Sequence, residues 1–233
     1  WSPPSELPVG KVGHPIACIA STYTFHAEFF ETELLPRFLG LRFDSTETER
    51  PYIVEREQAL GTAKVSVLVN ADCFDPSQST MRWDQLPVRV PNGVQHSKVA
   101  LLVWDKCVRL LVTSANLTRQ GYRRNREIVG GIDFYDDDTS APKELALDAI
   151  DFLEQAAYWA RVAEGVNERL QESLREARAR VRRWKKMPPI SSLRDFPSVA
   201  FVGGLPSRDG RAGRSSIQQV LASWGNRRAE EIT

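Results

Sequence analysis

The strongest indication of the fold comes from residues 96–127, HSKVALLVWDKCVRLLVTSANLTRQGYRRNRE. Two runs of apolar and β-branched residues within it, 97–104 (SKVALLVW) and 107–113 (CVRLLVT), predict two strands. Only Asp105 and Lys106 separate these runs, so we expect an antiparallel hairpin, although Asp-Lys is not the favoured turn pair. A hairpin brings the residues that precede its first strand next to the residues that follow its second.

Strand-like and helix-like segments alternate on both sides of this hairpin. Short runs of apolar and β-branched residues predict the other strands, and helical spacing of apolar residues predicts the helices. Residues 75–86 are loop-like. The alternation predicts an α/β fold, with a mixed β-sheet flanked by helices. The expected strands are 15–22, 64–70, 88–90, 127–134 and 198–203, and the expected helices are 25–38, 142–159, 167–185 and 215–224.

Four polar residues around the hairpin form a plausible phosphate site. His96 and Lys98 are two residues apart in the first strand, so we expect them on one face with Ala100 and Leu102. Asn116 lies just beyond the returning strand, and Glu127 opens the next one. A neutral imidazole can attack phosphorus, while a lysine and an amide can bind the phosphoryl oxygens. A carboxylate on the far imidazole nitrogen would fix the tautomer of the ring.

The same stretch resembles the signature of the phospholipase D superfamily, which is His-x-Lys followed by Gly/Ser-Ala-Asn and a downstream Glu. The form Ser-Ala-Asn-Leu-Thr-x-x-Gly-Tyr-x-x-Asn-x-Glu is that of its nuclease branches. The resemblance implies a metal-independent phosphodiesterase that acts on DNA through a phosphohistidine-type intermediate, without a cofactor. It implies that His96 is the nucleophile or the acid/base, that Lys98 and Asn116 bind phosphate, that Glu127 orients the histidine, and that Ser114 lines the pocket.

One departure from the superfamily pattern narrows the resemblance. The full pattern has an Asp five residues after the Lys, and Val103 stands at that position here. Absence of this Asp is a feature of the tyrosyl-DNA phosphodiesterase branch, to which the segments 22–25 and 199–208 are also similar. The resemblance therefore implies a phospholipase D-like domain over 1–190. It also implies that 191–233 is the start of a second related domain or a C-terminal appendage.

The chain carries one His-x-Lys motif, whereas members of this superfamily need two that meet at a pseudo-two-fold axis. His14 and His26 are the other histidines, and neither stands in such a motif. The resemblance thus implies a second half-site, either from a homodimer partner or from a C-terminal half outside this chain. The start at Trp1, without a Met or a signal pattern, favours a truncated protein.

Composition bounds the partners of the protein. Lys and Arg total 31 against 30 Asp and Glu, so the net charge is +1 and a globally basic nucleic-acid binder is not indicated. The local candidates for contact with DNA are Arg119, Arg123 and Arg124, which follow Asn116 closely. The three widely spaced cysteines fit a reducing, cytoplasmic setting. No apolar run is long enough to span a membrane, which disfavours a phospholipid hydrolase. A non-catalytic nucleic-acid-binding or scaffold module remains the main alternative.

Overall fold

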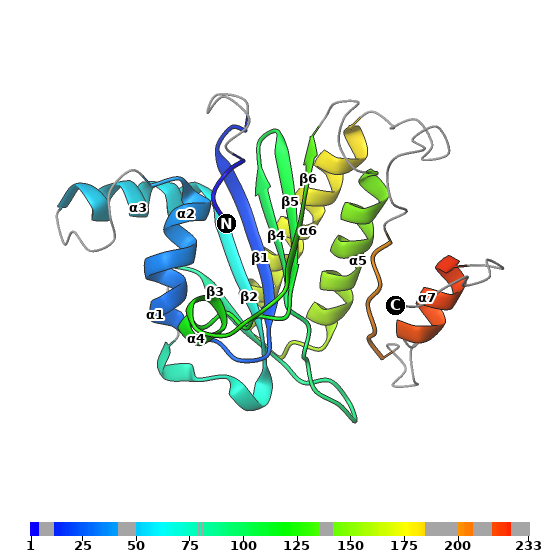
Figure 1. Cartoon of the computed structure of the whole chain (residues 1–233). Helices are drawn as coiled ribbons and strands as arrows, with labels where there is room; N and C mark the ends of the chain where they lie inside the picture. Colours follow the sequence, from blue (N-terminus) through cyan, green and yellow to red (C-terminus); the bar gives the residue numbers. More distant parts are fainter. Residues whose placement is uncertain are drawn as a thin grey trace.

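A computed structural model of the chain describes residues 1–4, 12–41, 50–78, 80, 82–135, 142–184, 200–206 and 216–224. These residues form a six-stranded mixed sheet in the order β3-β2-β1-β4-β5-β6, with helices on both faces (Figure 1), which confirms the predicted α/β class. The strands are β1 (Pro15–Thr22), β2 (Lys64–Asn70), β3 (Asp84–Val88), β4 (Val99–Trp104), β5 (Cys107–Thr113) and β6 (Val129–Tyr135). The helices are α1 (Ala27–Phe29), η2 (Phe30–Leu34), α2 (Leu35–Leu39), α3 (Arg50–Thr62), η3 (Ala71–Cys73), η4 (Pro76–Gln78), α4 (Arg119–Arg123), α5 (Lys143–Tyr158), α6 (Glu164–Arg183) and α7 (Ser216–Trp224).

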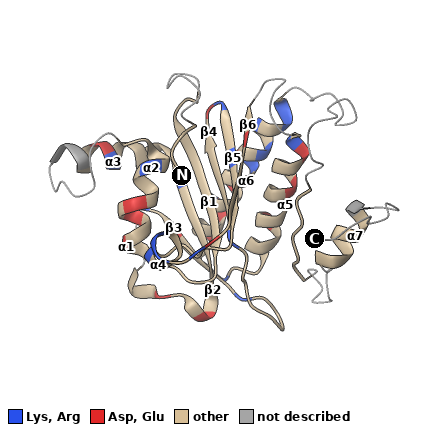
Figure 2. Ribbon diagram, viewed as in Figure 1, with Lys and Arg blue, Asp and Glu red and all other residues tan. Residues whose placement is uncertain are grey.

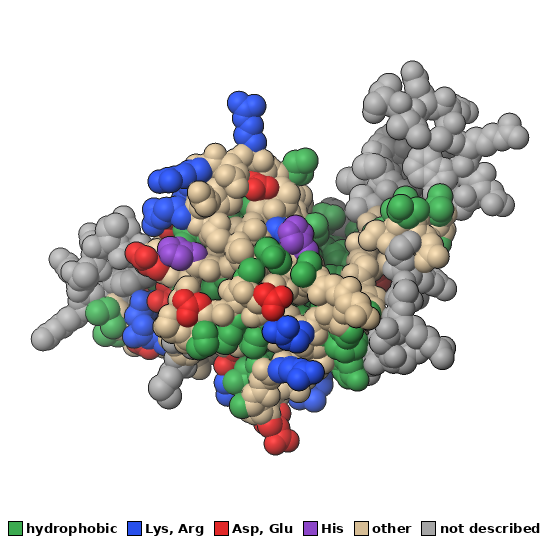
Figure 3. Space-filling view, turned by 90° about the horizontal axis from the view of Figure 1, so that it is seen from below, with side chains coloured by type: hydrophobic (Ala, Val, Ile, Leu, Met, Phe, Trp, Pro, Cys, Tyr) green, Lys and Arg blue, Asp and Glu red, His purple; other side chains and the backbone are tan. Residues whose placement is uncertain are grey.

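The directions of the strands bring several strand ends together at one end of the sheet. β1, β2 and β3 are parallel, and β4 pairs antiparallel with β1. β5 and β6 continue the antiparallel pattern. The carboxyl ends of β1, β2, β3 and β5 and the amino ends of β4 and β6 therefore meet at one end of the sheet, which we call the site edge. Figure 3 looks onto this end of the molecule.

Both faces of the sheet are buried, and β4 shows this most clearly, because its side chains point alternately to the two faces. Val99, Leu101 and Val103 pack in the cluster formed with α5 and α6. Their neighbours Ala100, Leu102 and Trp104 pack in the cluster formed with α1, η2 and α2. A strand covered on both faces is apolar at every position, which is why this hairpin dominates the sequence pattern.

The predicted helix over 25–38 is present over 27–39, but it is not a uniform α-helix. Its middle part, η2, is π-helical, and Pro36 lies in the first turn of α2. Proline has no N–H for the helical ladder, and a wider π turn accommodates the break. Gly40 ends the helix with a left-handed backbone (φ 68°), and the Leu41 N–H donates to the Pro36 carbonyl at 3.0 Å.

The prediction of a loop over 75–86 is wrong at its end, because β3 begins at Asp84. Leu86 and Val88 are fully buried, while Gln85 and Pro87 are partly exposed. Pro87 hides the strand in the sequence, since proline cannot donate to a sheet ladder and is tolerated mainly on edge strands. β3 is such an edge strand, and it ends at Val88, so the strand predicted over 88–90 is not formed beyond its first residue.

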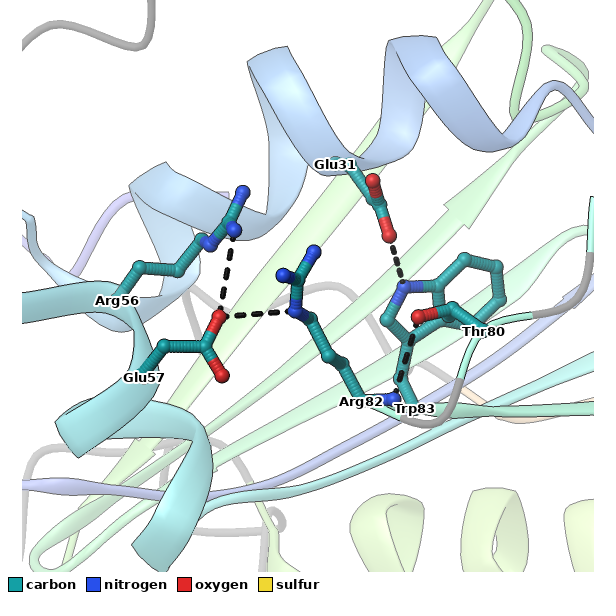
Figure 4. A network of polar contacts seen from close by, with 6 residues as sticks. All are labelled: Glu31, Arg56, Glu57, Thr80, Arg82 and Trp83. Carbon is teal, nitrogen blue, oxygen red and sulfur yellow. Dashed lines mark hydrogen bonds and ion pairs between the residues drawn. The ribbon is translucent and has the colours of Figure 1, made fainter. Parts of the chain in front are cut away.

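Helix α3 has no counterpart among the predicted elements, because its apolar residues do not recur at helical spacing. Its Glu57 carboxylate pairs with the Arg82 guanidinium at 2.8 Å, just before β3 (Figure 4). In the same network the indole N–H of Trp83 donates to Glu31 of η2 at 2.8 Å. These contacts connect the helical layer to the edge strand.

The predicted hairpin over 97–113 is confirmed, but its first strand begins at Val99 rather than at residue 97. His96 and Lys98 therefore precede the strand and do not continue its alternation. The turn at Asp105 and Lys106 is held by the segment before β1. The backbone N–H groups of these two residues donate to the carbonyls of His14 and Val12, each at 3.0 Å.

The C-terminal helices α5, α6 and α7 are confirmed, whereas the strand predicted over 198–203 is wrong for residues 200–203. This segment runs extended beside α5 (Figure 1) and pairs with no strand. Phe201 instead packs edge-on against Phe152, with ring centroids 5.5 Å apart, and the Gln219 side chain binds both the N–H and the carbonyl of Gly203. The predicted domain division at 190/191 lies outside the described residues.

Charge is unevenly distributed along α6, whose last turn carries Arg180, Arg182 and Arg183. Figure 2 shows these basic residues at the end of the helix that lies away from the site edge. Among the helices that the structure describes, none is long and apolar enough to cross a membrane.

Candidate functional site

The site edge collects the four polar residues that the sequence singles out. His96 and Lys98 lie just before β4, Asn116 follows β5, and Glu127 precedes β6. The Lys98 Nζ lies 3.2 Å from the His96 Nδ1 and 3.3 Å from the Nε2, and it donates to the His96 carbonyl at 3.0 Å. The lysine thus curls back onto the histidine, although the two residues are not neighbours on one strand face as expected.

Lys98 is a buried cation, with only 8% of its surface exposed. Within the part of the chain that the structure describes, it forms no ion pair at salt-bridge distance. Burial lowers the pKa of its ammonium group, and the more distant negative charge of Glu127 partly opposes this effect. A buried charge without a close counter-ion is costly to fold, and such groups cluster at functional sites.

Asn116 is oriented by the segment that follows β1. Its Oδ1 accepts hydrogen bonds from the backbone N–H groups of Tyr23 (3.3 Å) and Thr24 (3.4 Å), and it lies 3.4 Å from the Thr22 hydroxyl. Because backbone N–H groups can only donate, they identify the oxygen of the amide. The Asn116 Nδ2 forms no hydrogen bond with the described residues, so both of its protons can be donated to an anion.

Gly121 allows the loop that carries Asn116 to close tightly. A Cβ at this position would lie 2.5 Å from the Asn116 carbonyl oxygen. The Thr118 hydroxyl caps the short helix α4 by accepting from the Gly121 N–H at 3.1 Å. The glycine of the Leu-Thr-x-x-Gly segment therefore has a steric reason, since any side chain there would displace the backbone of Asn116.

Glu127 does not contact the imidazole. Its carboxylate accepts from the Ser114 hydroxyl and from the Asn125 amide, the latter at 3.2 Å. These hydrogen bonds lower the pKa of Glu127, with a smaller contribution from the charge of Lys98. The Ser114 Oγ in turn accepts from the Ile128 N–H at 2.9 Å. Ser114 and Glu127 are therefore hydrogen-bonded to each other. Glu127 acts on the site through its negative charge, which raises the pKa of Lys98.

The three candidate arginines have different surroundings. Arg119 and Arg123 both pair with Glu33 of η2, at 3.1 Å and 2.6 Å. Arg124 is exposed, and its guanidinium makes no ion pair with any described residue. Among the described residues, Arg124 alone of the three has no carboxylate within ion-pair distance, whereas Arg119 and Arg123 share the single charge of Glu33.

Comparisons with known proteins give limited information. No protein-family model and no curated protein matches the chain. Among solved structures, the chain is similar to NucT from Helicobacter pylori, with a TM-score of 0.39 and 17% identity over 65% of this chain and 84% of that one. It is also similar to a mutant of yeast tyrosyl-DNA phosphodiesterase, with a TM-score of 0.40 and 8% identity over 70% of this chain and 34% of that one. Because these scores and identities are low, we infer function from the residues of this chain.

Tyr23 also lies at the site, although no specific role for it could be predicted from the sequence. Its ring lies against the His96 ring, with centroids 4.9 Å apart and planes inclined by 51°. A hydrogen bond to Cys73, at the end of η3, raises the pKa of the Tyr23 phenol. Tyr23 thus touches the histidine with its ring and orients the asparagine with its backbone. The segment Thr22-Tyr23-Thr24-Phe25 was the signal in the sequence, but its contacts depend on residues more than 70 positions away.

A cavity of about 800 Å³ opens beside His96 and Lys98. One wall is formed by β5 and β6, and the other by Phe152 and residues 200–204. Apolar side chains dominate its lining, so the histidine lies between a polar edge and an apolar recess.

Proposed function

We propose that this chain is a phosphodiesterase that acts on DNA, as a nuclease or in DNA-end processing, and that it carries one half of a metal-independent site. One observation carries the proposal. The buried Lys98 ammonium, which has no close carboxylate, lies on the exposed His96 ring, and Asn116 directs an unused amide nitrogen from the same edge. This arrangement lacks an anion, and a phosphodiester supplies one.

In the proposed reaction, His96 is the nucleophile. An imidazole nitrogen forms a bond to phosphorus while the bond from phosphorus to the leaving oxygen breaks, and a second acid protonates that oxygen. Water then attacks phosphorus, the P–N bond breaks, and the imidazole is restored as a phosphate monoester leaves. Lys98 and Asn116 bind the non-bridging oxygens, whose charge grows in each step. Glu127 supports the positive charge of Lys98.

The acid that protonates the leaving oxygen requires another His-x-Lys half-site. We propose that it comes from a homodimer partner or from a C-terminal domain outside this chain, with 1–190 as the catalytic domain and 191–233 as the start of another domain or an appendage. Exposed apolar residues near the site edge support an interface there, because monomeric surfaces rarely group such residues. They are Val94, Val112, Ile128 and Val129. Buried free thiols at Cys18 and Cys107 are consistent with a cytoplasmic location.

Contacts with the DNA backbone fall to the arginines of α4 and the turn after it. Arg124 is exposed and can pair with a phosphate as it stands. Arg119 and Arg123 would first exchange Glu33 for phosphate, which costs little because their side chains are half exposed. We propose Ser114 as a further residue of the substrate site, with its hydroxyl donating to Glu127.

The test is cleavage of labelled single-stranded and duplex DNA in the presence of EDTA. We expect the wild-type chain to cleave and His96→Ala to lose at least about 10³-fold in rate, as expected for a nucleophile. His26→Ala is a matched control, since His26 is also exposed at the site edge and its side chain has no role in the reaction. Absence of cleavage by the wild type, or equal cleavage by His96→Ala, would contradict the proposal. Binding of DNA without cleavage would favour a non-catalytic module.

A further inference from the structure

A second pocket lies at the site edge, where β3 ends and the chain leaves α5. It has a volume of about 400 Å³ and is lined by Arg89, Pro91, Tyr158, Trp159 and Arg161, and we call it the Arg89–Arg161 pocket. Figure 3 shows basic side chains beside hydrophobic ones on this end of the molecule. Nothing in the catalytic proposal uses these residues.

The backbone fixes the spacing of the two arginines. Val88 and Ala160 form an antiparallel bridge. On either side of it, the Arg89 N–H donates to the Trp159 carbonyl and the Arg161 N–H donates to the Pro87 carbonyl, each at 3.1 Å. Val88 is fully buried, so alternation along an extended backbone directs Arg89 outward. Trp159, which ends α5 with φ −91° and ψ 2°, and the exposed Arg161 both line the pocket. The two backbone segments that carry Arg89 and Arg161 are therefore joined by two hydrogen bonds.

The side chains of the pocket combine cations with aromatic surface. Tyr158 is 51% exposed and meets Trp159 edge-on, with ring centroids 5.0 Å apart. Arg161 is exposed and forms no ion pair with the described residues. Arg89 pairs with Asp72 at 3.2 Å, but both side chains are more than half exposed. Such a pair contributes little to stability and gives way readily to another anion.

We propose that the Arg89–Arg161 pocket binds a single strand of nucleic acid, with phosphates on the two arginines and a base against the aromatic rings. This proposal rests on the proposed function and adds that the substrate is single-stranded rather than duplex. Exposed aromatic rings stack on bases only when the bases are unpaired, and arginines beside them hold the backbone. These two features together favour a single strand over a duplex.

The pocket lies close enough to His96 for one single-stranded nucleic acid to contact both places. β2 and β1 separate β3 from β4 in the sheet. Three strand spacings of about 4.8 Å place the end of β3 about 14 Å from the start of β4. Nucleotides stacked at about 3.4 Å each would cover this distance with about four residues. A short overhang would therefore contact both places at once.

The experiment measures binding of a fluorescent oligothymidylate by anisotropy, over a range of salt concentrations. The His96→Ala chain serves as the background, so that cleavage cannot interfere. We expect Arg89→Ala with Arg161→Ala to raise the Kd about tenfold and to reduce the slope of log K against log salt by about 1.4, which corresponds to two lost phosphate contacts. Tyr158→Ala should raise the Kd at least about fivefold with little change in slope.

The matched control removes the same charge elsewhere. Arg182→Ala with Arg183→Ala alters exposed arginines at the last turn of α6, away from the site edge, and should leave the Kd within about twofold of the background. An unchanged Kd and slope in the Arg89/Arg161 variant would overturn the proposal, as would tighter binding of a duplex than of the single strand. Since binding is read without turnover, a chain that binds through this pocket but never cleaves would refute the proposed function alone.

Discussion

The two ends of the β4–β5 hairpin differ in how their polar groups are used. At the turn end, the N–H groups of Asp105 and Lys106 donate to carbonyls of the preceding segment, and the Asp105 carboxylate accepts from the His14 N–H at 2.7 Å. Gly13 packs so closely there that a Cβ would lie 2.3 Å from the Asp105 side chain. Every one of these polar groups has its partner within the chain.

In the described part of the chain, the site end of the same hairpin leaves an ammonium without a counter-ion and an amide nitrogen without a partner. Lys98 is buried without an ion pair among the described residues, and the Asn116 Nδ2 has no partner there. The buried Lys98 ammonium lowers the stability of the fold at this end, whereas the polar groups at the turn end form hydrogen bonds with neighbouring residues. Polar groups that stabilise a fold are paired within it, whereas groups that serve a ligand are held in place and left unpaired. The predictions below separate these two uses.

Among the variants that compare the two ends of the hairpin, Lys98→Met should have the greatest effect, because it keeps the apolar stem of the side chain and removes its charge. We expect turnover in EDTA to fall about 10²–10³-fold, because the developing phosphoryl charge loses its main cation. The free energy of unfolding should stay the same or rise, since a buried charge is removed. Steady-state kinetics and urea denaturation of the same preparation measure both. A variant that unfolds more easily and keeps its rate would assign Lys98 to structure.

Asn116 permits a sharper separation, because one amide atom serves the fold and the other serves the ligand. Asn116→Ala should lose about 10²-fold in rate and also about 1–3 kcal/mol of stability, since the N–H groups of Tyr23 and Thr24 lose their acceptor. Asn116→Asp keeps an oxygen for those donors but brings a negative charge to the phosphate. We expect it to be as inactive as Asn116→Ala and more stable than it. Equal instability of the two variants would contradict the assignment of Oδ1.

The turn end should respond in the opposite way. Gly13 has φ 82° and no room for a side chain, so Gly13→Ala should destabilise the protein by about 1–3 kcal/mol. The rate per folded molecule should remain at the wild-type value, because the change lies at the far end of the hairpin. Thermal unfolding and turnover at a temperature well below the transition test this expectation. A loss of rate in fully folded Gly13→Ala would show that the two ends are coupled.

The smallest effect is expected in the pH profile. Lys98 acts as an ammonium, so turnover should fall as pH rises through its pKa, and burial places this alkaline limb below the ordinary range of lysine. The charge of Glu127 raises the pKa of Lys98, so Glu127→Gln should move the limb to lower pH. An alkaline limb that stays in place, or moves to higher pH, would show that Lys98 does not set it.

Much of this comparison could be predicted from the sequence, and the exceptions have physical reasons. The apolar runs around Asp105 predict the hairpin, and its geometry brings His96, Lys98 and Asn116 to one edge. β3 was not predicted because Pro87 argues against a strand. The proline is tolerated there because β3 lies at the edge of the sheet. The contacts of Tyr23 with His96 and Asn116, and the bridge between Val88 and Ala160, join distant segments that no local pattern connects.

The position of Glu127 shows a different limit. The sequence predicts a strand that begins at Glu127, whereas β6 begins two residues later, at Val129. The carboxylate still acts on Lys98 through its charge. Which atom its carboxylate binds depends on the side chains of Ser114 and Asn125, which compete with the imidazole at short range. A sequence pattern indicates which residues gather at this end of the sheet, but the hydrogen bonds among them depend on their positions in the folded chain.

Trapping of the covalent intermediate is the most direct test of His96 as the nucleophile. The chain is incubated with a phosphodiester in EDTA, quenched in alkali, where a phosphorus–nitrogen bond to histidine survives, and digested for mass spectrometry. We expect a phosphoryl adduct on the peptide that contains His96, at the imidazole itself. The adduct should be absent from His96→Ala but present in His26→Ala. Turnover of the substrate with no adduct on His96, or with the adduct on another residue, would contradict this role of His96.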